Sequence, residues 1–226
     1  MAQGTTAGLS PITPDATAAG TTRRLLRCGV VAGPLFVAVA TAQVLTRDGF
    51  DLGHQPISLL SVGDHGWIQI SNFIVAGLLN IAFAIGVRRA MPPGRLAAWA
   101  TTLLMVYGVG LVAGGAFVPD PALGFPPGTP DEIPDEMSWH ATLHAVGPAM
   151  AFLALISASL VLARRFSLQG RQWWARYSAA TGAICLVLSA WPDTGSAGVR
   201  LFLATVIGSA WVTTLGIDTL RRTRLT

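Results

Sequence analysis

The sequence contains no lysine and few charged residues of any kind. All fifteen basic residues are arginine, and charged residues make up only 12% of the 226 positions. About a quarter of the residues in a soluble domain are charged, so this shortage excludes an ordinary soluble domain. Hydrophobic residues make up 52% of the chain. We therefore expect a membrane protein whose partner is the lipid bilayer. Nucleic acid is not an expected partner, because the net charge of +4 comes from arginines at the ends of apolar runs.

Cysteine is also scarce. Cys28 and Cys185 are the only two, and each lies within an apolar run. Two such positions make neither a disulfide framework nor a Cys-x-x-Cys metal site, and they favour a role as small buried apolar residues. The sequence also lacks a Walker phosphate loop, a dinucleotide glycine fingerprint and a nucleophile elbow. No motif therefore points to the enzyme classes that are built on those elements.

The chain is instead a series of apolar runs. Residues 1–22 have almost no large apolar side chain and predict a disordered N-terminal tail. Residues 23–222 predict one transmembrane domain, and residues 223–226 are a C-terminal tail. The fold class expected is an all-α polytopic membrane protein with six transmembrane helices in one bundle, because about 20 residues cross the hydrocarbon. The first expected span follows Arg23, Arg24 and Arg27 and ends near Thr46. The other five lie at about 67–87, 96–118, 140–163, 173–191 and 200–219.

The first run has a second interpretation. Twin arginines, a short apolar core and the segment Ala40-Thr41-Ala42 also resemble an export signal with its cleavage site. The sequence leaves open whether this span is cleaved.

The arginines predict the orientation of the spans. Thirteen lie before the first run, between the second and third, around the turn between the fourth and fifth, or after the sixth. Only Arg47 and Arg200 lie on the other side. Connections rich in arginine stay in the cytoplasm, so we expect both termini to be cytoplasmic.

Two histidines in the fourth span suggest a metal site at the outer side. His140 and His144 are four residues apart and share one helix face. With His54 and Asp120 they would supply the ligands of a divalent metal such as zinc, whose bound water permits hydrolysis. The glutamate of a His-Glu-x-x-His motif is missing, however. In the alternative interpretation His140 lies at the membrane interface and His144 bonds to a neighbouring helix.

The first outer connection also carries candidate pocket residues. The segment from Asp51 to Ser61 is apolar enough to fold back onto the bundle as a short helix, with Pro56 in its first turn. Gln55 and Ser58 would then lie on one face and line an outer pocket. The alternative is that Ser58 only caps a helix end.

Arg200 is an exception to the arginine pattern. It opens the sixth span on the outer side, where an unpaired charge is costly. We expect it to pair with Asp193 or Asp120. The alternative is an anion-binding arginine within the same outer pocket.

Several short motifs resemble those of the bacterial integral-membrane family known as domain of unknown function 998. They are Gln55-Pro-Ile-Ser58-Leu, Gly66-Trp67 with Asn72 and Gly77, Pro119-Asp120, the histidines of the fourth span, and Arg200. The resemblance runs from about Arg24 to Arg222. It implies a six-span protein in the bacterial cell (inner) membrane, and it implies no activity.

A looser likeness exists to intramembrane metal hydrolases of the alkaline ceramidase and adiponectin-receptor type. The chain departs from them in span number and in lacking a second late histidine pair. Two functions are therefore expected. The first is binding of a small ligand or lipid in a polar outer-face pocket made by Gln55, Ser58, Asp120, His140, His144, Asp193 and Arg200. The alternative is a metal-dependent hydrolase that acts on a lipid or lipid-linked substrate.

Overall fold

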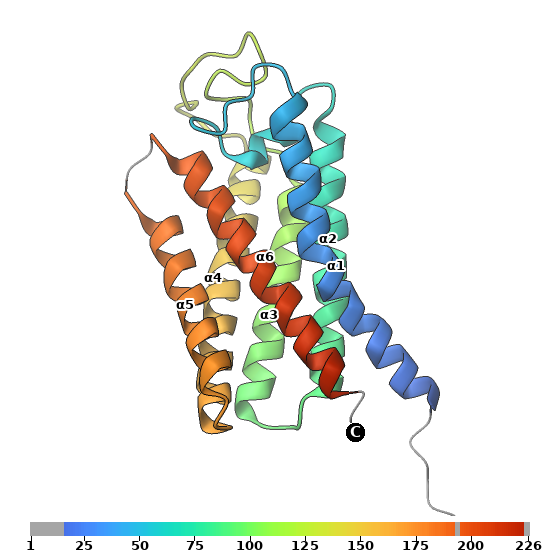
Figure 1. The fold of residues 1–226 in the computed structure, drawn as a ribbon. Coiled ribbons are helices and arrows are strands. Elements are labelled where there is room, and N and C mark those ends of the chain that lie inside the picture. The colour runs from blue at the N-terminus through green and yellow to red at the C-terminus, as the bar shows by residue number, and fades with distance from the viewer. Residues whose placement is uncertain (1–15, 193–194, 224–226) are drawn as a thin grey trace, which may run out of the picture.

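The protein is described by a computed structural model that covers residues 16–192 and 195–223. The described residues form six α-helices and one short 3-10 helix, with no strands (Figure 1). The α-helices are α1 (Ala16–Thr46), α2 (Gly66–Ala90), α3 (Arg95–Ala116), α4 (Trp139–Leu168), α5 (Gln172–Ala190) and α6 (Ala197–Arg222). The 3-10 helix, η1 (Ile57–Ser61), lies between α1 and α2. The predicted all-helical class is confirmed.

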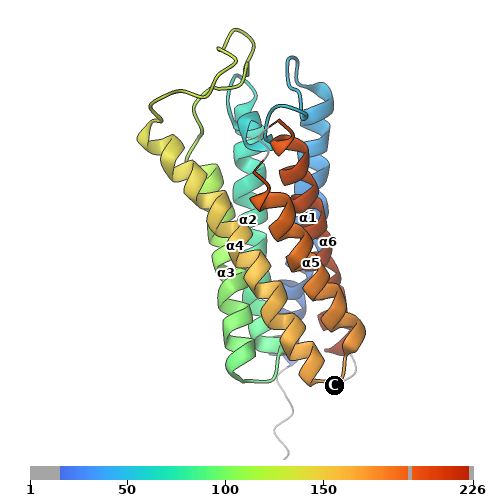
Figure 2. The same cartoon turned by 90° about the vertical axis from the view of Figure 1, so that its left-hand side faces the viewer.

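The helices form a closed ring in which each packs against the next along the chain, and α6 packs against α1. Consecutive helices run in opposite directions, so the long connections 47–65 and 117–138 lie at one end (Figures 1 and 2). The short connections after α2 and α4, the start of α1 and the end of α6 lie at the other end. We call the first the loop end and the second the arginine end.

Glycines allow close approach of neighbouring helices. A Cβ on Gly77 of α2 would lie 2.7 Å from the carbonyl oxygen of Gly108 on α3. A Cβ on Gly110 of α3 would lie 2.6 Å from the carbonyl oxygen of Gly147 on α4. Both distances are far below van der Waals contact. Any side chain at Gly77 or Gly110 would therefore push apart the helices that form one wall of the bundle.

Five of the described helices are long and apolar enough to cross a membrane: α1, α2, α3, α4 and α6. α5 has only 19 residues, and Gln172 and Arg176 lie in its first turns. Because its start is polar, α5 lacks a stretch as long and apolar as those of the other five helices. It nevertheless packs against both α4 and α6 in the ring. The apolar helices suggest a membrane-embedded bundle.

The start of α1 differs from the sequence prediction. The helix begins at Ala16, so residues 16–22, which were expected to be disordered, are helical. The local reason is that Ala16, Ala18 and Ala19 favour helix, and the hydroxyls of Thr21 and Thr22 bond to carbonyls one turn earlier. Residues 1–15 and 224–226 lie outside the described part of the chain.

Candidate functional site

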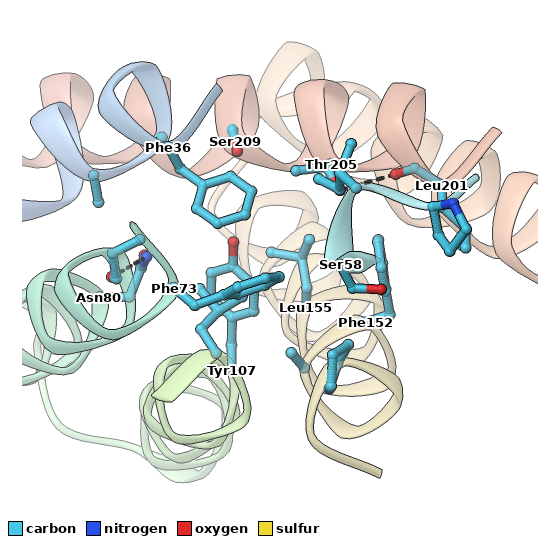
Figure 3. A pocket seen from close by; sticks show the side chains of 18 residues that line it. Phe36, Ser58, Phe73, Asn80, Tyr107, Phe152, Leu155, Leu201, Thr205 and Ser209 are labelled. Carbon is cyan, nitrogen blue, oxygen red and sulfur yellow. Dashed lines mark hydrogen bonds between the residues drawn. The ribbon is translucent and has the colours of Figure 1, made fainter. Parts of the chain in front are cut away.

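An apolar cavity lies inside the ring, below η1 at the loop end (Figure 3). Its volume is about 90 Å³. Residues of η1 and of every helix except α5 line it, and most are aromatic or aliphatic. The larger lining side chains are Phe36, Ile57, Phe73, Tyr107, Leu111, Phe152, Leu155 and Leu201. On α2 the lining extends from Phe73 to Asn80, a separation of seven residues or about 10 Å along the helix axis.

Polar side chains interrupt this apolar surface, among them Asn80, Tyr107 and Ser209. Asn80 donates its Nδ2 hydrogen to the Ala76 carbonyl at 2.8 Å, but its Oδ1 is buried with no partner among the described residues. Tyr107 is buried and directs its hydroxyl toward the centre of the cavity (Figure 3). Ser209 lines the wall opposite on α6. Polar groups at such depth are normally hydrogen-bonded, so this cavity offers unused hydrogen-bonding capacity to a bound molecule.

The roof of the cavity is η1. Ile57 and Leu60 are buried in the main core of the bundle, and Ser58 points its side chain into the cavity (Figure 3). The short helix predicted in this connection is present, but Pro56, which was expected in its first turn, immediately precedes it. Ser58 makes no capping hydrogen bond among the described residues, and it lines the interior cavity.

Gln55 holds this roof in place instead of lining the cavity. Its Oε1 accepts a hydrogen bond from the Asp51 amide at 2.9 Å, and its Nε2 donates to the Leu123 carbonyl at 2.6 Å. The side chain is buried. Gln55 therefore joins the first long connection to the second.

Arg47 also holds η1 in place, a role that was not predicted from the sequence. Its guanidinium donates to the carbonyls of Leu60 at 3.3 Å and Val62 at 2.8 Å. It also lies over the Phe125 ring, 5.3 Å from the ring centroid. The signal in the sequence was its position as one of two arginines on the arginine-poor side. Arg47 satisfies the carbonyls at the end of η1, which the short helix leaves without donors.

His140 and His144 share one face of α4, as their spacing predicts, and that face meets the end of α3. The Nδ1 of His144 lies 2.8 Å from the Phe117 carbonyl oxygen, and the Nδ1 of His140 lies 2.9 Å from that of Val118. A carbonyl only accepts, so each Nδ1 carries the proton. Both rings therefore bind carbonyls of the first two residues after α3, Phe117 and Val118.

Asp120 anchors the connection between α3 and α4. Its carboxylate accepts hydrogen bonds from the Ser138 amide at 2.8 Å and the Ser138 hydroxyl at 2.7 Å. Ser138 is in turn the N-cap of α4 and accepts from the Ala141 amide at 3.2 Å. These hydrogen bonds from Ser138 lower the pKa of Asp120, because they favour the charged carboxylate.

The four ligands expected for zinc are not brought together. His54 lies in the loops, where its Nε2 is 2.8 Å from Asp131 and both side chains are substantially exposed. Asp120 approaches His140 only to 4.0 Å. Among residues 16–192 and 195–223, no group of three His, Cys, Asp or Glu side chains is placed to hold a metal ion. One physical reason is that Asp120 is held by Ser138 and His54 lies beside Asp131 in the loops, so neither that carboxylate nor that ring is directed to the two histidines of α4.

Arg200 also binds backbone carbonyls. Its Nη1 donates to Leu188 at 3.0 Å and to Trp191 at 3.1 Å, and its Nε donates to Ser196. The guanidinium thus lies at the C-terminal end of α5, where a positive charge is favourable. The expected partner Asp193 lies outside the described residues, and Asp120 is bonded to Ser138, so the pairing with Asp193 stays a prediction.

Buried amides, which sequence reasoning also missed, join α1 to α2 behind the cavity wall. Gln43 donates to the Oε1 of Gln69 at 2.8 Å. Asn72 donates to the same oxygen at 3.2 Å and to the carbonyl of Phe36, a cavity residue, at 3.1 Å. The available signal was the presence of three amides at the outer ends of otherwise apolar runs. The network fixes the wall that carries Phe36 and Phe73.

At the arginine end, Asp218 pairs with two arginines. Nη2 of Arg171 lies 2.8 Å from both carboxylate oxygens of Asp218. Nε of Arg222, one turn later on α6, lies 3.1 Å from Oδ2. The signal in the sequence was a lone acid in the last turns of an arginine-terminated span, where the helix dipole disfavours a carboxylate.

Comparison with known proteins gives one result. The family model described as Protein of unknown function (DUF998) matches residues 30–218. The chain belongs to this family. No curated protein and no solved structure matches the chain. The motifs that suggested the DUF998 family lie mainly at the loop end, where Gln55, Asp120 and the α4 histidines bind backbone groups of the connections.

Proposed function

We propose that this DUF998 protein is a six-span membrane protein, with both termini in the cytoplasm of a bacterial cell, that binds a lipid chain or similar apolar molecule. The site is the interior cavity beneath η1. Two observations support six spans: α5 packs between α4 and α6 as a full member of the ring, and the arginine-rich segments all fall at one end. That end faces the cytoplasm by the positive-inside rule.

The single observation that carries the binding proposal is the combination of an apolar wall with unused polar groups. Phe36, Phe73 and Leu155 provide an environment for hydrocarbon. Tyr107 and Asn80 provide a donor and an acceptor at the deep end. Pockets for small molecules in proteins have this composition, with a few polar groups that set the orientation of the ligand.

The size of the cavity restricts the ligand. A volume of about 90 Å³ is smaller than the roughly 150 Å³ of an engineered cavity that binds benzene. The cavity therefore takes the end of one hydrocarbon chain, with a polar terminus such as a carboxyl or hydroxyl at Tyr107. The rest of a longer molecule extends toward η1. No arrangement of the described residues favours the hydrolase alternative.

A photoactivatable fatty acid tests this proposal in protein reconstituted into nanodiscs. Labelling mapped by mass spectrometry should fall on cavity residues such as Phe152 and Leu201. Ser58→Leu fills the roof side of the cavity, and Ser58 makes no side-chain hydrogen bond within the described chain, so the change should lower that labelling several-fold. Ser71→Leu is the matched control, because Ser71 is exposed on α2. Labelling restricted to the lipid-facing surface, or equal in the two variants, would contradict the proposal.

A further inference from the structure

A second, larger pocket opens at the arginine end of the bundle, opposite the cavity. Its volume is about 450 Å³. Three segments meet there: the connection after α2 with Met91 and Pro92, the end of α4 with Arg165, and the end of α6 with Asp218 and Arg222. None of the sequence motifs discussed above lies in it.

The charge of this pocket is unbalanced. Its ionisable lining consists of Arg165, Arg171, Arg222 and one acid, Asp218. Asp218 is shared between Arg171 and Arg222, so it compensates one positive charge and leaves two. The neighbouring arginines of the same end add to this positive potential and bring no acid into the lining.

The guanidinium groups are also held in place before any ligand arrives. Arg171 is only 16% exposed, and its guanidinium lies over the rings of Phe166 at 4.6 Å and Trp174 at 5.3 Å. Arg165 donates one Nη2 hydrogen bond to the Pro92 carbonyl at 3.2 Å, its one side-chain bond within the described chain. The remaining N–H groups of Arg165 are available to a ligand.

We propose that this pocket binds an organic phosphate, with Arg165 and Arg222 as its ligands and Arg171 as the fixed charge behind them. Planar guanidinium groups match phosphate oxygens in pairs, which makes arginine the preferred residue for this chemistry. The volume admits a glycerol phosphate unit, and Met91 and Phe166 give the pocket an apolar side for the attached group. Two sources share this chemistry: the headgroup of an anionic membrane lipid and a soluble phosphate ester.

Binding to the purified full-length protein distinguishes these sources. Native mass spectrometry would compare phosphatidylglycerol with phosphatidylcholine, and glycerol 3-phosphate would be added as a competitor at fixed ionic strength. We expect retention of phosphatidylglycerol over phosphatidylcholine. Displacement by millimolar glycerol 3-phosphate would assign the site to soluble esters as well, and lack of displacement would assign it to the lipid.

Two neighbouring arginines provide a matched comparison. Arg165→Gln removes a lining guanidinium and should weaken phosphatidylglycerol binding about tenfold, the effect of one charge-assisted hydrogen bond. Arg164→Gln removes the same charge from an exposed position outside the lining, and should change binding by less than about twofold. Gln169→Glu, an exposed lining position, should weaken binding through repulsion without disturbing the bundle.

Three results would overturn the inference. One is equal weakening by Arg164→Gln and Arg165→Gln, which would mean that only general surface charge attracts the lipid. A second is an unchanged affinity in both Arg165→Gln and Gln169→Glu. The third is absence of any preference for phosphatidylglycerol together with no binding of glycerol 3-phosphate.

Discussion

The side-chain amide of Gln55 lies 2.6 Å from the carbonyl oxygen of Leu123, so the two long connections at the loop end form one bonded unit. Through this bond the second connection, 117–138, helps to hold η1 over the interior cavity. Gly198 shows how tightly the unit is packed, since a Cβ there would overlap the carbonyls of Leu52 and Gln55. The start of α6 is thereby joined to the same roof.

Gln55→Leu should destabilise the protein. The change removes the side-chain partner of the Asp51 amide and of the Leu123 carbonyl, and each lost hydrogen bond costs about 0.5–1.5 kcal/mol. A lower thermal midpoint and faster proteolysis of 117–138 are expected in detergent. Gln172→Leu, at the exposed start of α5, is the control and should shift the midpoint little. Equal midpoints in the two variants would show that the bond from Gln55 to Leu123 does not stabilise the roof.

The hydrogen bonds of Asp120 predict that the stability of the connection 117–138, at the loop end, depends on pH. The hydrogen bonds from Ser138 place its folded-state pKa below the unfolded value of about 3.9. Its contribution to stability is therefore complete above that unfolded value and is lost as the pH falls through the lower folded-state pKa. After correction for the intrinsic exchange rate at each pH, the amides of 117–138 should lose protection in acid in the wild type. Asp120→Asn should exchange fast at neutral pH and depend less on acid. A variant with wild-type exchange across the whole range would rule out this anchor.

The sequence predicted the helices well because each long apolar run has few alternatives in a membrane. The limits of α2 and α3 fall within a few residues of those expected. A short helix was expected in the first long connection and η1 is present there, although Pro56 precedes it and is not in its first turn. The start of α1 was wrong because composition described residues 16–22 as a tail, whereas alanines there extend a helix that is already formed.

The candidate site was predicted less well, for a physical reason. Spacing placed His140 and His144 on one face, and that is correct, but spacing does not say what the face meets. It meets the chain just after α3, where the carbonyls of Phe117 and Val118 accept both Nδ1 hydrogens. The cavity itself is made by Phe36, Phe73 and Tyr107, which resemble ordinary core residues in a sequence. Only the packing shows that they leave a space between them.

Tyr107→Phe tests the deep end of the cavity. The hydroxyl makes no hydrogen bond within the described residues, so its loss should leave the thermal midpoint nearly unchanged. If the hydroxyl binds the polar terminus of a fatty acid, affinity should fall about tenfold. Titration of a fluorescent fatty acid into nanodisc-embedded protein measures this difference. A large loss of stability together with unchanged affinity would show instead that the hydroxyl has a structural partner.

Asp218→Asn should be among the more destabilising polar substitutions. It leaves Arg171, which is 16% exposed, without its carboxylate, and breaking a buried pair costs about 3–5 kcal/mol. We expect a loss of stability at the lower end of this range, because Arg171 still stacks on Phe166 and Trp174 and because the pair is partly exposed. Arg222→Gln, at a position 57% exposed, should cost less than about 1 kcal/mol. Chemical unfolding in detergent would measure both, and equal losses would contradict a dominant pair with Arg171.

The orientation of α5 decides between five and six spans. If α5 crosses the membrane, reporter fusions after Arg89, Arg165 and Arg222 should be cytoplasmic, and fusions at Gly128 and Ser196 should be external. The physical basis is that Arg176 and the exposed tryptophan Trp173 lie at one end of α5, where an interface would hold them, while its second half is apolar. If α5 does not cross, the fusion at Ser196 becomes cytoplasmic while that at Gly128 stays external. A C-terminus on the external side would then follow, and the proposal of six spans with both termini in the cytoplasm would fail.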